Sequence, residues 1–248
     1  AWDSLKGYCS RVILGISKPQ GEVIPEISKW ACRRAQAVAL VRWGEKEDLP
    51  LFVLLVVLSY TFQFRVRSEL FKVRFHETLV EHEDMPLGHQ KLVIWLDRRK
   101  HRQTRHDLSR DCTCKVTHKD GTLGSVLCPV HGFLKLKPRL PVLGFLVHAP
   151  PSLRSEALPM EGFSERDINP LIRRASHECG DPLWDRASSH GFRRGRACDF
   201  ALEGGTLGQI LLGGDWKSSA FRAYIHSVSE QLHSQALLHV LGNASDSE

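Results

Sequence analysis

The sequence predicts an α+β fold that is mostly helical, with a small antiparallel sheet placed between helices. Over most of the chain, apolar residues recur at helical spacing. Between residues 71 and 97 they alternate instead with polar residues, which is the period of a β-strand. Hydrophobic residues make up 42% of the 248 residues and charged residues 25%, a balance typical of a globular protein with its own core.

Two helices are predicted near the beginning of the chain, after residues 1–25, which are loosely patterned and interrupted by prolines. Helical spacing extends from Ile27 to Trp43, and Gly44 is expected to end this helix. Pro50 lies near the start of the next one, the apolar run LPLFVLLVVLSY. Because this run is shorter than the roughly 20 residues that a membrane-spanning helix needs, it is interpreted as a helix buried in the core.

The sheet is predicted from two runs of alternating residues, joined by a turn at Met85-Pro86-Leu87-Gly88. The apolar positions are Phe71, Val73 and Phe75 in the first run and Leu92, Ile94 and Leu96 in the second. Prolines between residues 134 and 162 predict a loop or crossing segment. Ser164 is a favourable N-cap for a helix that runs to about His177. Further helices are expected at 191–201, at 205–213 and from Ser218 onward.

The charge and cysteine content limit the kinds of partner and compartment. Lys and Arg number 34 against 28 Asp and Glu, a formal net charge of +6, and the excess gathers at 98–102, 173–174 and 193–196. A basic surface favours a polyanionic partner, nucleic acid ahead of a membrane, although a merely soluble basic protein has the same composition. The seven cysteines are an odd number in a chain that is not small, which argues for a reducing compartment and against a disulfide framework.

One stretch combines residue types suited to phosphate chemistry. In SHGFRRG, His190 and Arg193 stand three residues apart and share one face of a predicted helix. A guanidinium group matches two phosphate oxygens at once. Further along, GGDWKSSAFRAY places Trp216 and Tyr224 after a Gly-Gly turn. His-x-x-Arg alone occurs often by chance, so the interpretation depends on the order and spacing of the whole block.

This block resembles the catalytic domain of the tyrosine recombinases, the phage-integrase-type enzymes that break and rejoin DNA. Within the superfamily, HGFRRGRACD and GQILLGGDWKSSAFRAYI look most like the transposon-derived kind, such as the Crypton and DIRS-like elements. The resemblance extends over residues 28–230 and implies a tyrosine recombinase catalytic-domain fold for residues 41–248. Residues 1–40 would then be a linker or the remnant of an N-terminal core-binding domain.

The resemblance also implies an arginine at the end of an apolar helix, shortly before Ser-Glu. Arg65 in RVRSEL is the first candidate, and Arg67 is a rival because it stands where relatives carry proline. Alternatively, Arg65 is only a cation near the negative end of a helix dipole. A lysine is implied on or after the β-hairpin, where Lys100 matches and Lys91 is the second choice. A lysine there could also touch DNA phosphates without doing chemistry.

In the mechanism that the resemblance implies, Tyr224 attacks a DNA phosphodiester and forms a 3′-phosphotyrosyl intermediate. The arginines hold the phosphate, His190 and Trp216 add hydrogen bonds as the transition state forms, and Lys100 protonates the departing 5′ oxygen. Catalysis needs no ATP, metal or small-molecule substrate. The implied partner is double-stranded DNA, bound by a homo-tetramer in the nucleus, with no role for a membrane.

A second cluster has the residue types of a zinc site. Cys112-Thr113-Cys114 and Cys128-Pro129-Val130-His131 are two ligand pairs separated by residues 115–127. They resemble the Cys-x-Cys…Cys-Pro-x-His pattern of the transposon-like relatives, and zinc takes three cysteines and one histidine tetrahedrally in closed structural sites. Such a site would hold the segment beyond the hairpin, near Lys100. The alternative is four reduced side chains without a metal.

Two other functions remain open from the sequence. A type IB topoisomerase-like enzyme would use the same chemistry to nick and reseal DNA without exchanging partners. A domesticated DNA-binding module would bind DNA without cleaving it. The presence of all six candidate catalytic residues argues against a loss of catalytic activity. The short N-terminal segment, in contrast, argues for reduced activity. The apolar positions after Tyr224 suit packing against a neighbouring subunit and equally against their own domain.

Overall fold

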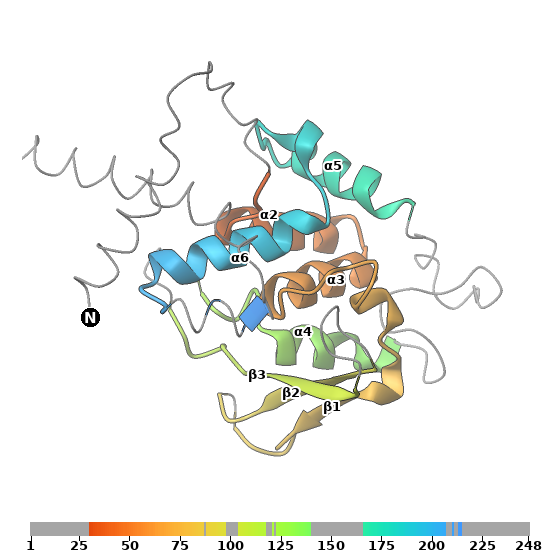
Figure 1. Cartoon of the computed structure of the whole chain (residues 1–248), viewed down its shortest axis with the longest axis vertical. Helices are drawn as coiled ribbons and strands as arrows, with labels where there is room; N and C mark the ends of the chain where they lie inside the picture. Colours follow the sequence, from red (N-terminus) through yellow and green to blue (C-terminus); the bar gives the residue numbers. More distant parts are fainter. Residues whose placement is uncertain are drawn as a thin grey trace, which may run out of the picture.

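The computed structural model describes residues 30–86, 88–97, 104–117, 121, 123–139, 166–206, 210, 213 and 214, and shows a helical body with a three-stranded antiparallel sheet along one side (Figure 1). This arrangement confirms a helix-rich α+β class with a small antiparallel sheet. The helices are α2 (Arg34–Lys46), α3 (Pro50–Thr61), α4 (Pro129–Leu136), α5 (Ile168–Glu178) and α6 (His190–Leu202). The strands are β1 (Thr78–Glu81), β2 (Lys91–Leu96) and β3 (His106–Asp111). Short 3-10 turns are η1 (Leu70–Lys72), η2 (Phe75–Glu77), η3 (Lys137–Arg139) and η5 (Trp184–Arg186).

Helix α3 forms the centre of the core. Every residue from Pro50 to Tyr60 is buried, because the helix is apolar on all sides and packs against α2, α4 and α6. Each Leu, Val or Phe side chain that is fully buried in this way contributes about 1.5–3 kcal/mol. The prediction of a buried core helix is confirmed. Among the residues that the structure describes, no helix combines the length and hydrophobicity needed to cross a membrane.

The sheet turns one face toward the helices. It has the order β1-β2-β3, with Val80 opposite Leu92 and Ile94 opposite Leu108. The side chains of Leu92 and Ile94 are buried, and α4 packs against β2 and β3. The second predicted run of alternating residues is therefore confirmed as β2. The turn predicted at 85–88 does lie between β1 and β2, although Leu87 is outside the described residues.

The first predicted strand is wrong in its position. Residues 70–77 form the turns η1 and η2, and β1 begins only at Thr78. In these turns the N–H of Val73 donates to the carbonyl of Leu70 at 3.1 Å, and the N–H of Glu77 donates to Arg74 at 3.0 Å. Local bonds of this kind use the backbone groups that a strand needs for pairing. Phe71 and Val73 are buried all the same, which explains why their alternation resembled a strand.

The first helix also differs from the prediction over 27–43. Residues 30–33 are not helical, and α2 begins where the Gln36 side chain accepts a hydrogen bond from the N–H of Arg33 at 2.7 Å. The helix continues past Gly44, which lies inside it and is buried. Helix α5 covers the described part of the helix predicted over 164–177, and α6 confirms the one predicted at 191–201. Helix α4 occupies the beginning of the predicted loop 134–162, of which residues 140–162 are outside the described part.

Two glycines bring α6 into direct contact with the segment 30–33. The Trp30 ring meets Phe192 edge-on with 6.1 Å between centroids, and the N–H of Cys32 donates to the carbonyl of Gly191 at 2.9 Å. A Cβ atom at Gly191 would collide with the Trp30 ring, and one at Gly195 with the Cys32 carbonyl. Glycine at these two positions, one turn apart, therefore sets how close α6 lies to the rest of the core.

Candidate active site

The start of α6 carries two of the predicted catalytic residues. His190 is the first residue of the helix and remains exposed, whereas Arg193 is 4% exposed. Because they are three residues apart, both side chains lie on one face of the helix. The close packing at Gly191, between them, leaves this face little freedom to move.

Arg193 connects α6 to the end of α3. Its Nη1 donates to the backbone carbonyl of Gln63 at 3.0 Å, and its Nη2 donates to the carbonyl of Gly214. Arg65 follows Gln63 by two positions in the sequence. The structure thus places the segment that leaves α3 directly beside the buried guanidinium group of α6.

Arg65 and Arg67 differ in their surroundings. Arg65 is half-buried and forms an ion pair with the buried carboxylate of Glu69, with 2.6 Å between Nη1 and Oε1. Arg67 is exposed. Arg65 is therefore fixed by a buried partner, whereas Arg67 lies at the surface of the same segment.

The electrostatic environment favours a neutral His190. Although His190 is exposed, the surrounding protein removes part of its hydration, and this partial desolvation lowers the pKa of its imidazole below the ordinary value; neighbouring positive charges lower it further. These charges belong to Arg194, Arg193, Arg65 and Arg67. A neutral imidazole beside guanidinium groups can accept a proton while the arginines hold an anion. The described part of the site therefore combines an imidazole whose neutral form is favoured with several guanidinium charges.

Three predicted catalytic residues, Lys100, Trp216 and Tyr224, lie outside the described residues. The second choice of lysine, Lys91, is described. It lies on β2 opposite Asp111 of β3 and forms a long ion pair with that carboxylate, with 3.8 Å between Nζ and Oδ1. The structure therefore brings together Arg65, His190 and Arg193, and gives Lys91 an acidic neighbour on the sheet.

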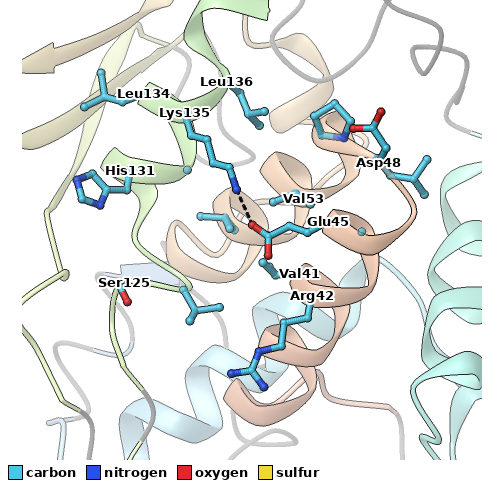
Figure 2. A pocket seen from close by; sticks show the side chains of 16 residues that line it. Val41, Arg42, Glu45, Asp48, Val53, Ser125, His131, Leu134, Lys135 and Leu136 are labelled. Atoms are coloured by element: carbon cyan, nitrogen blue, oxygen red, sulfur yellow. Dashed lines mark hydrogen bonds and ion pairs between the residues drawn. The ribbon is translucent and has the colours of Figure 1, made fainter.

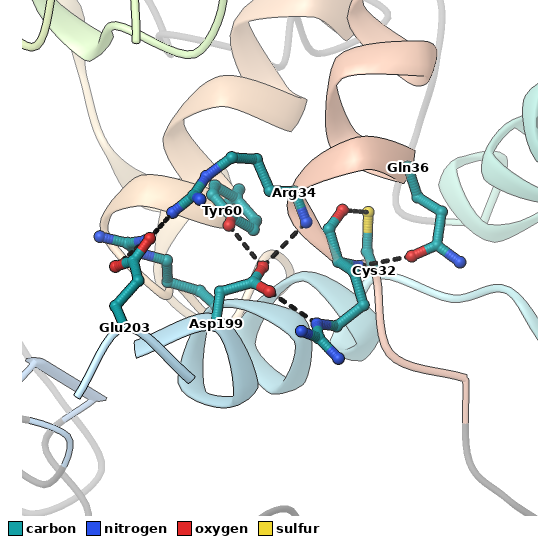
Figure 3. A network of polar contacts seen from close by, with 8 residues as sticks. Cys32, Arg34, Gln36, Tyr60, Asp199 and Glu203 are labelled. Carbon is teal, nitrogen blue, oxygen red and sulfur yellow. Dashed lines mark hydrogen bonds and ion pairs between the residues drawn. The ribbon is translucent and has the colours of Figure 1, made fainter. Parts of the chain in front are cut away.

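A buried polar network holds the middle of α6 (Figure 3). Asp199, 6% exposed, accepts hydrogen bonds from the Tyr60 hydroxyl at 2.6 Å, from the N–H of Arg34 at 2.8 Å and from Nε of Arg33 at 2.6 Å. Burial, and then the charge of Asp199, raises the pKa of Tyr60 well above its ordinary value. Asp199 was not predicted as a site residue, because an aspartate in the middle of a helix has no distinctive sequence signal.

The three predicted cysteine ligands also meet. The Sγ atoms of Cys112, Cys114 and Cys128 all lie within 4.8 Å of one another, with 3.7 Å between Cys112 and Cys128. Cys128 precedes the first residue of α4, and His131 in the first turn of α4 places Nδ1 2.8 Å from the Sγ of Cys114. Tetrahedral zinc with Zn–S bonds of about 2.3 Å separates its sulfur ligands by about 3.8 Å. The sulfur atoms fit that spacing, whereas the closer Cys114–His131 pair would have to open slightly.

A groove of about 720 Å³ lies elsewhere, between the α2–α3 turn and α4 (Figure 2). Lys135 of α4 and Glu45 of α2 form an ion pair across it, with 2.7 Å between Nζ and Oε1. Large pockets are the usual first candidates for small-molecule sites. Of the predicted catalytic residues that the structure describes, Arg65, His190 and Arg193, none lines this groove, which is at the opposite end of α3 from Arg65.

By sequence, the chain matches no known protein family and no curated protein. Among solved structures, it is similar to the XerH site-specific recombinase bound to palindromic difH substrate in a post-cleavage complex, with a TM-score of 0.58 and 11% sequence identity. The match covers 87% of this chain and 55% of that one, so the chain spans about half the length of the recombinase. The likeness shows that the two proteins share a fold.

Proposed function

We propose that this chain cleaves and rejoins DNA through a phosphotyrosyl intermediate, as a tyrosine recombinase or integrase of the transposon-derived, Crypton or DIRS-like kind. The observation that carries the proposal is the contact of Arg193 of α6 with the segment beyond α3, through the Gln63 carbonyl, which places the segment that holds Arg65 beside the start of α6, where His190 lies. Phosphoryl transfer needs such a cluster, because charge on the nonbridging oxygens must be neutralised as the transition state forms. The fold shared with a site-specific recombinase supports the same reaction class.

In the proposed reaction, the Tyr224 oxygen forms a bond to the phosphorus while the bond from phosphorus to the 5′ oxygen breaks. His190 accepts the phenolic proton, and Lys100 donates a proton to the departing 5′ oxygen. Arg65 and Arg193 hold the two nonbridging oxygens, and Trp216 adds a hydrogen bond. Rejoining reverses these steps with a second 5′ hydroxyl. The proposed assembly is a homo-tetramer on double-stranded DNA in the nucleus.

The structure argues against one of the other two tyrosines as the nucleophile. Tyr60 is 2% exposed, and its hydroxyl donates to Asp199 in the core. Its raised pKa makes the phenolate harder to form. A buried, hydrogen-bonded phenol of this kind cannot reach a DNA backbone. Tyr8 lies outside the described residues, so Tyr8 and Tyr224 are the tyrosines that an experiment must separate.

The test is to trap the covalent intermediate on short duplexes that carry a nick near the cleavage site and randomised flanking sequence. Wild-type protein should form an adduct, and peptide mapping should place the nucleotide on Tyr224. Tyr224→Phe should abolish the adduct and retain noncovalent DNA binding, whereas Tyr8→Phe and Tyr60→Phe should still form it. An adduct in Tyr224→Phe, or its absence in wild type, would overturn the proposal. Resealing without recombinants would favour the topoisomerase-like alternative.

We also propose that Cys112, Cys114, Cys128 and His131 hold a structural zinc ion. The sulfur spacing supports this, as does the position of the ligands, which join the end of β3 to the start of α4. Bound zinc would supply a cross-link between these two elements. The catalytic steps above do not pass through it.

A further inference from the structure

Arg110 of β3 connects the sheet with two other parts of the fold. It pairs with Leu92, on the sheet face that is turned toward the helices. Its Nε donates to the carbonyl of Thr61, the last residue of α3, at 2.9 Å, and its guanidinium lies 5.0 Å above the Phe62 ring. Its Nη2 makes a longer contact, 3.5 Å, with the carbonyl of Gly213.

Arg193 makes the same kind of bridge, two residues further along the first segment and one residue further along the second. It donates to the carbonyls of Gln63 and Gly214, whereas Arg110 donates to those of Thr61 and Gly213. Two guanidinium groups from different elements therefore tie the segment leaving α3 to the Gly213-Gly214 pair, which is helical here and not the turn expected from the sequence. We call this pair of contacts the arginine brace.

Gln63 fills the space between the two bridged segments. It is fully buried with a left-handed φ of 55°, which is uncommon for a residue other than glycine. Neither polar atom of its side-chain amide has a hydrogen-bond partner in the described part of the chain. A Cβ atom on Gly213 would lie 2.9 Å from Nε2 of Gln63, too close for an ordinary contact. The Gly213-Gly214 pair thus lies against a buried residue with an uncommon backbone conformation, and a conformation of this kind persists only where the surroundings enforce it.

We propose that Arg110 is a positioning residue: through the arginine brace it fixes the Gly213-Gly214 pair, from which the chain continues to Trp216 and Tyr224. The inference rests on the proposed function, because it assigns Arg110 a role in presenting the nucleophile. Arg193 takes part in the brace as well as in the proposed site, so its own position and that of the Gly213-Gly214 pair are set together. Misplacing a reacting group by about 1 Å costs on the order of 100-fold in rate.

The test compares Arg110→Ala, Arg110→Lys and Gly213→Ala with Arg42→Ala, which removes an exposed arginine of α2. Single-turnover adduct formation on the nicked duplexes should fall about 10- to 100-fold in the first three. Lysine is included because a point charge cannot span two carbonyls as a guanidinium fork does. Noncovalent duplex binding should stay within about threefold of wild type, since the substitutions disturb orientation more than charge. Arg42→Ala should behave as wild type in both measurements.

A second measurement does not depend on catalysis. Hydrogen exchange of peptides that contain Gly213 and Gly214 should accelerate in Arg110→Ala and Gly213→Ala, while peptides from α3 and α6 keep wild-type protection. Unchanged exchange in the peptides with Gly213 and Gly214, or unchanged adduct formation in Arg110→Ala, would overturn the inference. Exchange that accelerates throughout the chain would also overturn it, because Arg110 would then be a general stability residue. If wild type forms no adduct, the proposed function fails, and exchange still decides whether the brace exists.

Discussion

The carboxylate of Glu69 holds Arg65 at two points: its Oε1 lies 2.6 Å from Nη1, and its Oε2 accepts a hydrogen bond from the Arg65 N–H at 3.0 Å. The side chain of Glu69 is 2% exposed and that of Arg65 19%. A buried carboxylate that binds both the backbone and the guanidinium group fixes the arginine before any ligand arrives. This pre-organisation favours Arg65 over the exposed Arg67 as the first phosphate ligand.

The first prediction separates these two arginines. Arg65→Ala should lower the rate of single-turnover adduct formation at least about 100-fold, because the substitution removes a positive charge that stabilises the transition state. It also leaves the buried carboxylate of Glu69 without its ion-pair partner. Arg67→Ala should change the same rate less than about threefold and should weaken duplex binding at low salt, as expected for a surface charge. The measurement is adduct formation on nicked duplexes at saturating protein. A larger loss in Arg67→Ala than in Arg65→Ala would reverse the assignment.

The second prediction concerns pH. Burial and the surrounding arginines disfavour the charged imidazole, so His190 binds its proton only below the ordinary pKa of 6.5. Adduct formation should therefore stay constant from neutral pH down to below 6.5 and then fall as His190 is protonated. Arg194→Ala removes one of the charges and should move this fall toward higher pH. His190→Gln should form the adduct slowly at all pH values, and its rate should not fall at acid pH. An acid limb centred above 6.5 in wild type would contradict the assigned role.

The third prediction concerns the network that holds α6 in Figure 3. Asp199→Asn removes the negative charge that pairs with Arg33 and weakens the hydrogen bond that the Tyr60 hydroxyl donates to this side chain. Breaking a buried ion pair costs about 3–5 kcal/mol, and Arg33 is 28% exposed, so we expect a loss of about 2–4 kcal/mol in the free energy of unfolding. Tyr60→Phe removes one hydrogen bond to a buried carboxylate and should cost about 1.5–3 kcal/mol. Urea unfolding measures both, and equal midpoints for Asp199→Asn and wild type would show that the network does not stabilise the fold.

The sequence predicted the fold correctly where the hydrophobic pattern of a segment matches its burial in the structure. Helix α3 is apolar on all sides and begins at Pro50, so its place in the core could be predicted, and the spacing of His190 and Arg193 located α6. Strand β3 was missed because its sequence, HDLSRD, is mostly polar, and Arg110 was missed with it. Gln63 gave no signal, since glutamine is not a residue that favours a positive φ. These parts of the site depend on contacts between segments that are far apart in the chain.

The last prediction concerns the metal site that joins β3 to α4. Purified protein should contain about one equivalent of zinc, because the Sγ atoms of Cys112 and Cys128, 3.7 Å apart, already have the spacing of two ligands on one ion. Cys112→Ser and Cys128→Ser should lose the metal and about 2 kcal/mol or more of stability, a fall of roughly 4–8 °C in Tm. Cys179→Ser, at an exposed cysteine after α5, is the matched control and should retain both. Elemental analysis with thermal unfolding decides the matter: less than about half an equivalent of zinc in wild type, or no change in Tm on chelation, would mean that the three thiols and His131 meet without a metal.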